Sequence, residues 1–554
     1  MESHYRKILH DTEEWVIRSL RTQETDSESK VYGAFYDRNR MVQAKHALYC
    51  VNYEIACYCN EDSRFLGDVK IYDSIMAALR YVRSVQHENG LFDYITCNFF
   101  SAPDTAFCIG IILPHLQFLR IKENRTEKET DIFHALDLIF HAGVYGLLEG
   151  GFHTPNHRWA ISALLCKGYE FYGDDKLKEA AFEYLKEGID CNEDGEYSEK
   201  SAGNYNGVNN HAMILLSQAL KDDSYEANAV RNLRLMLTYW EPDDSVFTAN
   251  STRFDKDRLV YPTQYYLHYL MMGLKYNVPE FLSMCNRIME IVDEKRVAAP
   301  DILIWFMLYP EFRAADLKGS YRQPDFERYC KWSGIYRARK GNYSYTVMKG
   351  KSNFLYFHDG TIKLAVKLAG SFCEHRAFIS EDMEVLPDGR IHLSQVMHGW
   401  YYLPFPEDKL PNTSDWWQME NTTKRPKKFG PDMQIDVWIK EAKGGVDVTF
   451  KTSGVEGAPW RIEIAFNGVE FMQNDHLAMP VTGSEILVVK DGYLEAYNEG
   501  DSITVGPCFG KHRFTEGKED SEAKTAGAAT LYLTDYTEFE HTIQIRNKRD
   551  LEGF

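Results

Sequence analysis

The segment YDSIMAALRYVRSV, residues 72–85, indicates the kind of fold that the first half of the chain adopts. It places Ile75, Ala78, Leu79 and Val82 three or four residues apart, which is the spacing of one face of an α-helix. Further segments of this kind follow, separated by Gly, Asp, Asn and Pro, which are typical of helix ends. They span residues 104–121, 128–143, 158–173, 175–190, 209–221, 226–240 and 262–276. Such a succession predicts helical hairpins that pack as a solenoid or a closed toroid.

From about residue 340 the pattern changes to that of β-strands. Short runs rich in β-branched and aromatic residues, such as TIKLAVKLAG (361–370) and MQIDVWIKEAKGGVDVTFKT (433–452), are separated by DG, GG and NG turns. Many strands at this spacing predict a β-sandwich. We therefore expect a multidomain chain, α then β: an N-terminal (α/α) toroid of helical hairpins in residues 1–335, and a C-terminal antiparallel β-sandwich in residues 336–554.

Composition narrows the class of function. The 554 residues carry a formal net charge of −19, which argues against nucleic acid and against an anionic membrane surface as partners. An acidic substrate remains compatible with this charge, because the field inside a cleft can oppose the net charge. Aromatic residues make up 14% of the chain. They suit either a large core or a carbohydrate cleft in which sugar faces stack on rings.

The sequence also carries expectations about location. No stretch of about 18 apolar residues is apparent, so we expect no transmembrane helix. The first 20 residues read as an amphipathic helix rather than a signal peptide. Eleven cysteines without a CxxC pair suit free thiols in a reducing compartment. We therefore expect a cytoplasmic protein, and the sequence leaves its oligomeric state open.

One segment, GGFHTPNHRWAISALLC (150–166), opens a helix with three reactive side chains. Its Thr-Pro-Asn sequence is typical of a helix start, which puts Asn156, His157 and Arg158 where anions are favoured. A carboxamide, an imidazole and a guanidinium in that place suit carboxylate neutralisation and proton transfer. The alternative is a capping Asn beside a structural, hydrogen-bonded His.

A second segment, DGEYSEKSAGNYNGVNNHAMILL (194–216), combines a DG turn, a polar loop and then Tyr205 at the start of a new helix. A tyrosine phenol is ordinarily protonated at neutral pH, so a basic role would require a cationic or polar neighbour. The alternative is a packing Tyr in a loop.

The third segment, residues 370–405, belongs to the β-half. It carries His375 beside Arg376, and His398 close to Trp400, Tyr401 and Tyr402. Either group is expected to cover a cleft of the helical domain, although a His on a strand is more often structural.

Together these features resemble the polysaccharide lyases built from a toroid and a sandwich, including the heparinase II/III-like and alginate lyase families. Those enzymes carry an Asn-His motif in the toroid, followed by a segment like D-G-x-x-x-E and then a Tyr. Here Asn156-His157 is followed by Asp194-Gly195, Glu199 and Tyr205.

Two further segments, WYYL (400–403) and DWWQMENTT (415–423), are more loosely similar to the hyaluronate and chondroitin lyases. In those enzymes a catalytic His and then a Tyr follow the DG turn. Lys200 and Asn209 stand in those places here. This departure favours the heparinase and alginate lyase type and makes Tyr197 the alternative to Tyr205.

The resemblance implies β-elimination at a 4-linked uronate of an acidic oligosaccharide or polysaccharide, giving a 4,5-unsaturated end. This chemistry requires neutralisation of the carboxylate, a base for the C5 proton and an acid for the departing O4. By resemblance, Asn156 would hold the carboxyl group, His157 would take the proton or polarise that group, and Tyr205 would protonate the leaving oxygen. His375 would supply a further donor. The residues expected to bind substrate are Arg158, Glu199, Arg376, His398, Trp400 and Tyr402.

Two other functions remain open. A glycoside hydrolase on a toroid would use paired carboxylates, for which Asp104, Glu199 and either Asp243 or Asp244 are candidates. A non-catalytic glycan-binding protein would use its aromatic residues alone.

No cofactor is expected, because no nucleotide, flavin or pyridoxal motif is visible. A metal in the β-half is conceivable, but the spacing of its His residues matches no closed zinc pattern, so we expect none. The residues considered for it are His358, Asp359, His375, His392 and His398.

Overall fold

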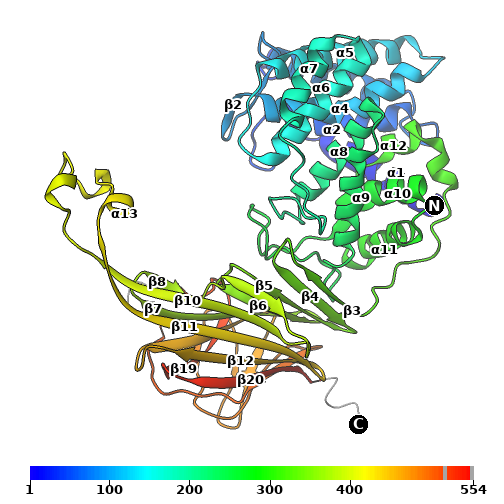
Figure 1. Ribbon diagram of the computed structural model, residues 1–554. Helices are drawn as coiled ribbons and strands as arrows, with labels where there is room; N and C mark the ends of the chain where they lie inside the picture. The colour runs from blue at the N-terminus through cyan, green and yellow to red at the C-terminus, as the bar shows by residue number, and fades with distance from the viewer. Residues whose placement is uncertain (516–520, 549–554) are drawn as a thin grey trace. The chain divides into compact units, whose positions relative to one another are not determined.

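The computed structural model describes residues 1–515 and 521–548 and divides into two compact units (Figure 1). One unit comprises Met1–Trp240 with Asp244–Gln323, and the other comprises Glu241–Asp243 with Pro324–Phe554. The first is helical and the second consists mainly of antiparallel strands. The expected order of an α/α toroid followed by a β-sandwich is confirmed. Strand β3 begins at Phe326, ahead of the boundary at 335 that the sequence pattern suggested.

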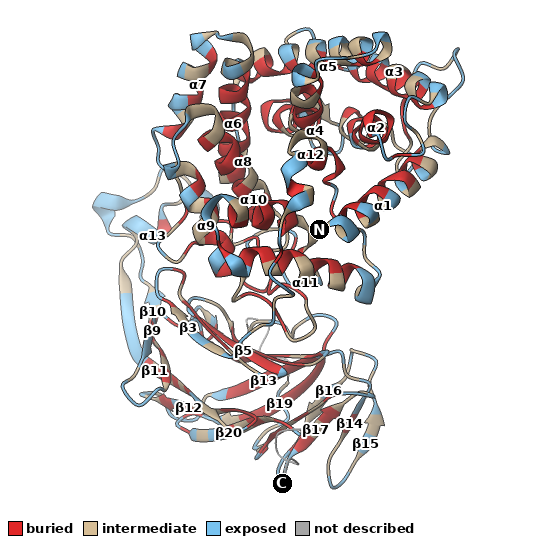
Figure 2. Ribbon diagram, turned by 90° about the vertical axis from the view of Figure 1, so that its right-hand side faces the viewer, coloured by how far each residue is buried: buried red, intermediate tan, exposed pale blue. Residues whose placement is uncertain are grey.

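The helical unit is built from helices that pack on their neighbours in the chain, and α2, α4, α6 and α8 also pack in succession on one another. Buried residues line the inward faces of these helices (Figure 2). The helices are α1 Glu2–Leu20, α2 Ala44–Cys59, α3 Val69–Ser84, α4 Ala102–Ile121, α5 Glu127–Gly146, α6 Pro155–Tyr172, α7 Asp175–Leu185, α8 Tyr205–Leu220, α9 Ser224–Met236, α10 Tyr266–Tyr276, α11 Pro279–Lys295 and α12 Leu303–Leu308. A short hairpin, β1 Phe92–Tyr94 and β2 Asn98–Ser101, precedes α4.

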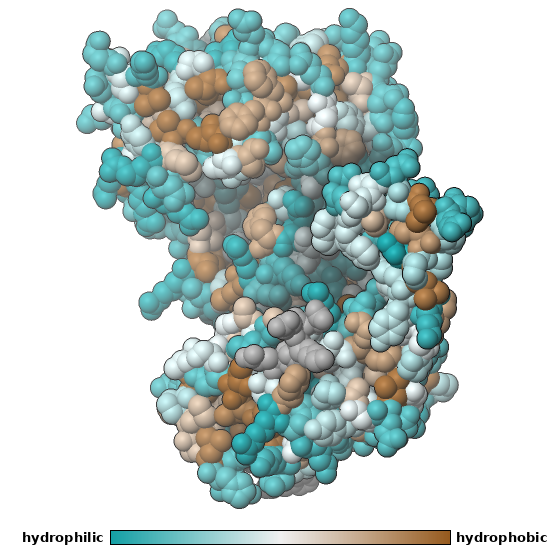
Figure 3. Space-filling model, turned by 90° about the vertical axis from the view of Figure 1, so that its left-hand side faces the viewer, coloured by the Kyte–Doolittle hydropathy of each residue, from teal (hydrophilic) through white to brown (hydrophobic). Residues whose placement is uncertain are grey.

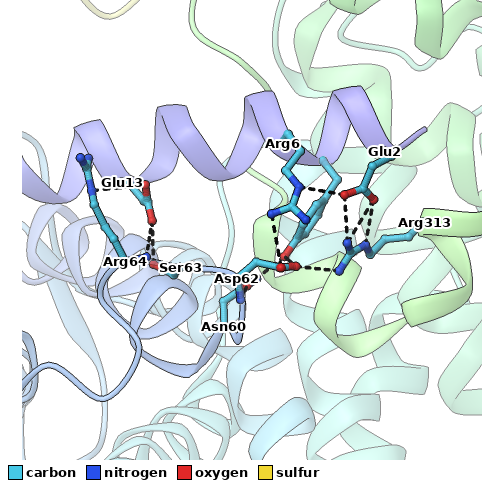
Figure 4. A network of polar contacts seen from close by, with 9 residues as sticks. Glu2, Arg6, Glu13, Asn60, Asp62, Ser63, Arg64 and Arg313 are labelled. Carbon is cyan, nitrogen blue, oxygen red and sulfur yellow. Dashed lines mark hydrogen bonds and ion pairs between the residues drawn. The ribbon is translucent and has the colours of Figure 1, made fainter.

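The two ends of the helical unit meet. Helix α1 packs against α12 and against the short turn η3, Pro310–Ala314. Figure 4 shows the polar part of this contact: Arg313 lies 3.0 Å from Glu2 and 2.9 Å from Asp62. These pairs are partly exposed, so water and salt screen them and their contribution to stability is small. The apolar part is larger, and it includes the rings of Tyr5 and Phe306, whose centroids are 5.6 Å apart.

Two helices of this unit are long and apolar enough to cross a membrane by length and composition alone, contrary to the reading of the sequence. They are α4 and the segment Glu127–Glu149. Core helices of water-soluble domains pass the same test. In α4, 72% of the apolar window is buried inside the helical unit, so packing against neighbouring helices accounts for its composition.

The β unit contains two nine-stranded sheets among its described residues. One has the order β15-β14-β17-β18-β20-β12-β11-β10-β9, and the other has the order β16-β19-β13-β7-β6-β5-β4-β3, with β8 paired to β7. All pairs within these sheets are antiparallel except β16 with β19. The strands are β3 Phe326–Cys330, β4 Ile335–Lys340, β5 Tyr343–Met348, β6 Asn353–Asp359, β7 Ile362–Phe372, β8 His375–Ala377, β9 Asp382–Val385, β10 Ile391–Tyr402, β11 Lys427–Ala442, β12 Gly445–Ser453, β13 Pro459–Asn467, β14 Phe471–Gln473, β15 Ala478–Pro480, β16 Ile486–Val488, β17 Leu494–Tyr497, β18 Ser502–Gly506, β19 Ala529–Tyr536 and β20 Glu540–Asn547.

The core of the β unit lies between these sheets. In β11, Met433, Ile435, Val437 and Ile439 are fully buried, whereas the residues between them are not. This period of two directs one side of the strand to the core. Strands β10 and β11 form a long hairpin whose connection contains the short helix α13, Asn421–Lys424.

Candidate active site

The candidate residues of the helical unit lie at the starts of two helices that pack on each other, α6 and α8. Thr154 is the N-cap of α6 and Pro155 is its first residue, so Asn156 and His157 belong to the first turn. Tyr205 is the first residue of α8, after the N-cap Asn204. The structure therefore places these residues at helix N-termini, where the sequence predicted them.

Glu199 links the two helix starts. The Asn156 amide donates from Nδ2 to both Glu199 carboxylate oxygens at 2.9 Å, and to the Thr154 hydroxyl at 2.9 Å. The Asn156 backbone N–H also donates to Glu199 at 3.3 Å. Asn156 is 0% exposed and Glu199 only 4%. The amide hydrogens of Asn156 are thus bonded to Glu199 and Thr154, and its side chain is buried in this structure.

Arg253 is a candidate residue that the sequence analysis missed. Its Nε atom is 3.3 Å from Glu199 Oε1, and its guanidinium carbon lies 5.1 Å from the centroid of the Tyr205 ring. The side chain is 31% exposed, so it joins the buried Asn156–Glu199 pair to the surface at Tyr205. The sequence signal is weak, because Arg253 is one of three cations in the polar run STRFDKDR (251–258).

Two sets of hydrogen bonds fix the loop that carries Arg253. Thr252 donates from its backbone N–H and from its hydroxyl to the backbone oxygen of Glu199, at 3.1 and 3.0 Å. The Asp255 carboxylate accepts hydrogen bonds from Ser201, Ser251 and the backbone N–H of Gly203 at 2.7–2.9 Å. Asp255 is only 2% exposed, so these charge-assisted bonds hold the loop rigidly beside α8.

His157 is half-buried beside Phe107, with the two rings edge to face and their centroids 5.9 Å apart. Burial lowers the pKa of His157 to about 4, and Asp104 opposes this shift. The nearby side chains of Arg253 and two other cationic residues lower the pKa further. The imidazole is therefore neutral at physiological pH. Its Nδ1 atom accepts a hydrogen bond from the His153 backbone N–H at 3.3 Å, so this nitrogen can take a substrate proton only when that hydrogen bond is broken.

Tyr197, in the loop before α8, and Tyr205, the first residue of α8, differ in their exposure to solvent. Tyr205 is half-buried, and its ring packs on Phe254 at 5.8 Å. Its hydroxyl makes no hydrogen bond within residues 1–515 and 521–548. Tyr197 is 0% exposed, donates to Asn210 at 3.1 Å, and has a pKa raised well above its ordinary value by burial. Access to substrate therefore favours Tyr205 over the alternative Tyr197.

Arg158 faces a different set of partners from Arg253. It forms an ion pair with Glu187, and its guanidinium carbon lies 4.4 Å from the Trp159 ring centroid. Arg158 and Arg253 thus each have a carboxylate partner, and Arg253 differs in lying against the Tyr205 ring.

The remaining candidates belong to the β unit. Trp400 and Tyr402 lie on β10 with their ring centroids 4.7 Å apart, and Lys427 Nζ lies 3.6 Å from the Trp400 centroid. Trp400 donates to Glu374, which precedes His375 and Arg376 on β8. His398 is exposed and pairs with Asp432 at 2.9 Å. The structure thus brings Trp400 and Tyr402 next to the turn that leads into β8, as one aromatic and basic surface.

Three of the four histidines considered for a metal lie next to carboxylates. His358 lies 3.2 Å from Glu241, and His392 lies 2.8 Å from Asp436 and stacks on Trp438. Among the described residues there is no group of three or more His, Cys, Asp or Glu side chains arranged to hold a metal ion.

Replacing Glu199 by Gln tests the buried connection between α6 and α8. Burial raises the pKa of Glu199 above its ordinary value of 4.5, although Asn156 and Arg253 oppose this. The folded state therefore holds this proton more tightly than the unfolded state, so the contribution of Glu199 to stability decreases as pH rises above about 4.5. As the pH is raised from about 4 to about 8, the free energy of unfolding should therefore fall less in Glu199→Gln than in the wild type. The measurement is urea unfolding at each pH.

The matched control is Glu179→Gln, which changes an exposed glutamate of α7 in the same unit. It should follow the wild-type pH dependence. If Glu199→Gln and the wild type showed the same pH dependence, burial would not raise the pKa of the Glu199 carboxyl group as described above.

No protein-family model and no curated protein sequence matches this chain. Solved structures do share its fold. A xanthan lyase from Paenibacillus superposes with a TM-score of 0.55 at 9% identity, over 98% of this chain and 57% of that enzyme. The chain thus spans little more than half the length of the xanthan lyase.

Two other lyases match over more of their length. A chondroitin AC lyase from Streptomyces coelicolor A3, solved in complex with chondroitin sulphate, gives a TM-score of 0.53 at 9% identity, over 99% of this chain and 80% of that one. The heparan sulfate lyase HepC from Pedobacter heparinus gives 0.51 at 11% identity, over 97% and 82%. The chain therefore has the fold of these polysaccharide lyases.

Proposed function

We propose, from this shared fold and from the groups at the starts of α6 and α8, that the protein is a lyase. It would cleave a uronic-acid-containing oligosaccharide or polysaccharide by β-elimination and leave a 4,5-unsaturated uronate end. The observation that carries the proposal is the chain of contacts from Asn156 through Glu199 and Arg253 to Tyr205, at the start of the helix in which His157 directly follows Asn156.

Each requirement of the reaction has a candidate group. Arg253 would bind and neutralise the uronate carboxylate, which makes the C5 proton more acidic. This role passes from Asn156 to Arg253 because Asn156 is fully buried. His157 would accept the C5 proton, and the accessible hydroxyl of Tyr205 would protonate the departing O4. Where the proton and the leaving group lie on the same face of the sugar, Tyr205 would serve both steps.

The resemblance also assigns roles to side chains of the β unit. His375 would supply a further hydrogen-bond donor. The surface of Trp400 and Tyr402, with Lys427 against it, suits an acidic sugar because it offers ring faces next to a cation.

The carboxylates suggested for a hydrolase have other partners. Asp104 accepts hydrogen bonds from Ser101 and Asn98 at the start of α4, and Asp244 pairs with Arg287 at 2.8 Å. Asp243 lies in the β unit, near His358 and Lys363. A glycoside hydrolase needs two carboxyl groups on either side of the scissile bond, one of which holds a proton for the leaving group. The hydrogen bonds and ion pairs of Asp104, Asp243 and Asp244 favour structural roles for these residues.

Ultraviolet absorbance of the products tests the proposal. Full-length protein is incubated with alginate, glucuronan, hyaluronan, chondroitin and heparin-type oligosaccharides. We expect at least one of them to give a product that absorbs, because the new C4–C5 double bond is conjugated to the carboxylate. New reducing ends without that absorbance would identify a hydrolase and contradict the proposal. Binding without any cleavage would instead indicate a glycan-binding protein.

A further inference from the structure

We infer that Lys45, Tyr94 and Phe107 form a subsite for an anionic group, a carboxylate or a sulfate, on the sugar next to the one that reacts. This inference rests on the proposed function, and it narrows the substrate class to glycans that carry acidic groups on adjacent positions along the chain.

The three side chains come from three elements of the helical unit. Lys45 is the second residue of α2, Tyr94 ends β1, and Phe107 lies in the second turn of α4. The Lys45 ammonium nitrogen is 4.7 Å from the Phe107 ring centroid and 5.6 Å from that of Tyr94. Phe107 also meets His157 edge to face, with the ring centroids 5.9 Å apart. Lys45 and His157 therefore both contact the same aromatic ring.

The charge of Lys45 is not neutralised by a protein carboxylate. Among the described residues, none brings a carboxylate oxygen within 4.0 Å of its nitrogen, although Lys122 and Lys167 in the same unit both form such pairs. Lys45 also gains nothing from its helix. A cation in the first turn faces the positive end of the helix dipole, and the first turn of α2 contains no acidic residue. The position suits an external anion.

The surrounding surface fits a sugar. The hairpin of β1 and β2 exposes Ile95, Phe99 and Phe100, with 43%, 65% and 59% of their surfaces accessible. Phe100 also stacks on His87 at 3.9 Å. Figure 3 shows apolar side chains gathered on the helical unit in the view from the side on which β2 lies in Figure 1. Ring faces beside an ammonium group match the apolar face and the acidic substituent of one sugar unit.

The test measures binding and turnover separately, with the full-length chain. Binding is measured by titration calorimetry in a Tyr205→Phe background, so that no substrate is consumed. The probes are an unsulfated uronate oligosaccharide, a sulfated one and a neutral one of similar length. We expect Lys45→Gln to weaken binding of an acidic probe about 10- to 100-fold and to leave the neutral probe unchanged. Lys45→Arg should retain most of the affinity, since it keeps the charge.

Lys70→Gln is the matched control. Lys70 is likewise the second residue of its helix, α3, and is exposed, but no aromatic ring contacts it in the described structure. It should bind all probes as the parent does. With an active Tyr205, Lys45→Gln should raise KM by a similar factor and change kcat less than about twofold, because the subsite lies beside the reacting sugar.

The outcomes separate the subsite from the lyase proposal. Weaker binding of the sulfated probe alone would identify sulfate as the ligand, and weaker binding of the unsulfated uronate would identify a carboxylate. If binding depended on Lys45 but no product absorbed ultraviolet light, the subsite would stand and the lyase proposal would be contradicted. If the protein turned over acidic probes but Lys45→Gln bound them as tightly as the parent, the lyase proposal would stand and the subsite would be overturned.

Discussion

Replacing Tyr205 by Phe is expected to lower kcat about 10²–10⁴-fold on any oligosaccharide that the wild type cleaves, because the leaving oxygen loses its proton donor. The substitution removes a single hydroxyl that makes no hydrogen bond within the described residues, and the ring can remain against Phe254 and Arg253. The midpoint of thermal unfolding should therefore change little. The measurement is the initial rate of product absorbance at saturating substrate.

Tyr197→Phe is the contrasting variant. It removes the buried hydrogen bond to Asn210, so we expect a loss of about 0.5–1.5 kcal/mol in stability with a nearly unchanged kcat. The assignment of Tyr205 fails if Tyr205→Phe retains more than about a tenth of the wild-type rate. A large loss of rate in Tyr197→Phe, with the fold intact, would point to the other tyrosine.

Replacing Glu241 by Ala should cost about 3–5 kcal/mol in the stability of the β unit. Glu241 is 5% exposed and lies 3.1 Å from Arg337, which is 1% exposed. Ser344 also donates to it, and His358 is 3.2 Å away. Truncation removes the carboxylate partner of a guanidinium that cannot reach water. Scanning calorimetry of the full chain would record a lower unfolding temperature of the β unit.

Lowering the pH should also destabilise the β unit, because it protonates Glu241. Burial alone would raise the pKa of Glu241, but Arg337, His358 and Ser344 hold it well below its ordinary value of 4.5. The folded pKa thus lies below the unfolded one, so this stabilisation is complete above about pH 4.5 and is lost as the pH falls below that value. Glu241→Gln should lack this part of the acid sensitivity.

Two variants make the Glu241 result specific. Glu384→Ala removes a glutamate that is 63% exposed from its contact with His392, and it should cost less than about 1 kcal/mol. Adding Arg337→Met to Glu241→Ala should recover much of the lost stability, because no buried charge is left behind. A loss below about 1 kcal/mol in Glu241→Ala would contradict the role assigned to this buried pair.

The elements that the sequence pattern missed have identifiable reasons. Helix α2 carries buried residues around most of its circumference, so AKHALYCVNYEIACYC (44–59) shows little helical periodicity. Strands β3 and β4 were overlooked because FERYC and IYRARK contain several charged residues. One of these, Arg337, is buried against Glu241, which is a pairing that local sequence does not reveal.

The residues of the candidate site likewise fall into those that the local sequence indicated and those that it did not. The turn and capping signals around Asn156, His157 and Tyr205 are local, since they depend on residues within one helical turn, and they placed these side chains at helix starts. The role of Asn156 changed because burial depends on what other segments cover it. Arg253 and Lys45 gave no local signal, because each is one cation among many in the sequence.

The sequence by itself determined the order of the two architectures and the helix starts that carry Asn156, His157 and Tyr205. Hydrophobic period and helix capping act between residues a few positions apart, so they can be read along the chain. Only the tertiary structure decided that Glu199 joins Asn156 to Arg253, that Phe107 contacts both Lys45 and His157, and that Glu241 pairs with Arg337 in the β unit. Those contacts join segments far apart in the chain, and packing and burial select them over the many other pairs of the same charge and type.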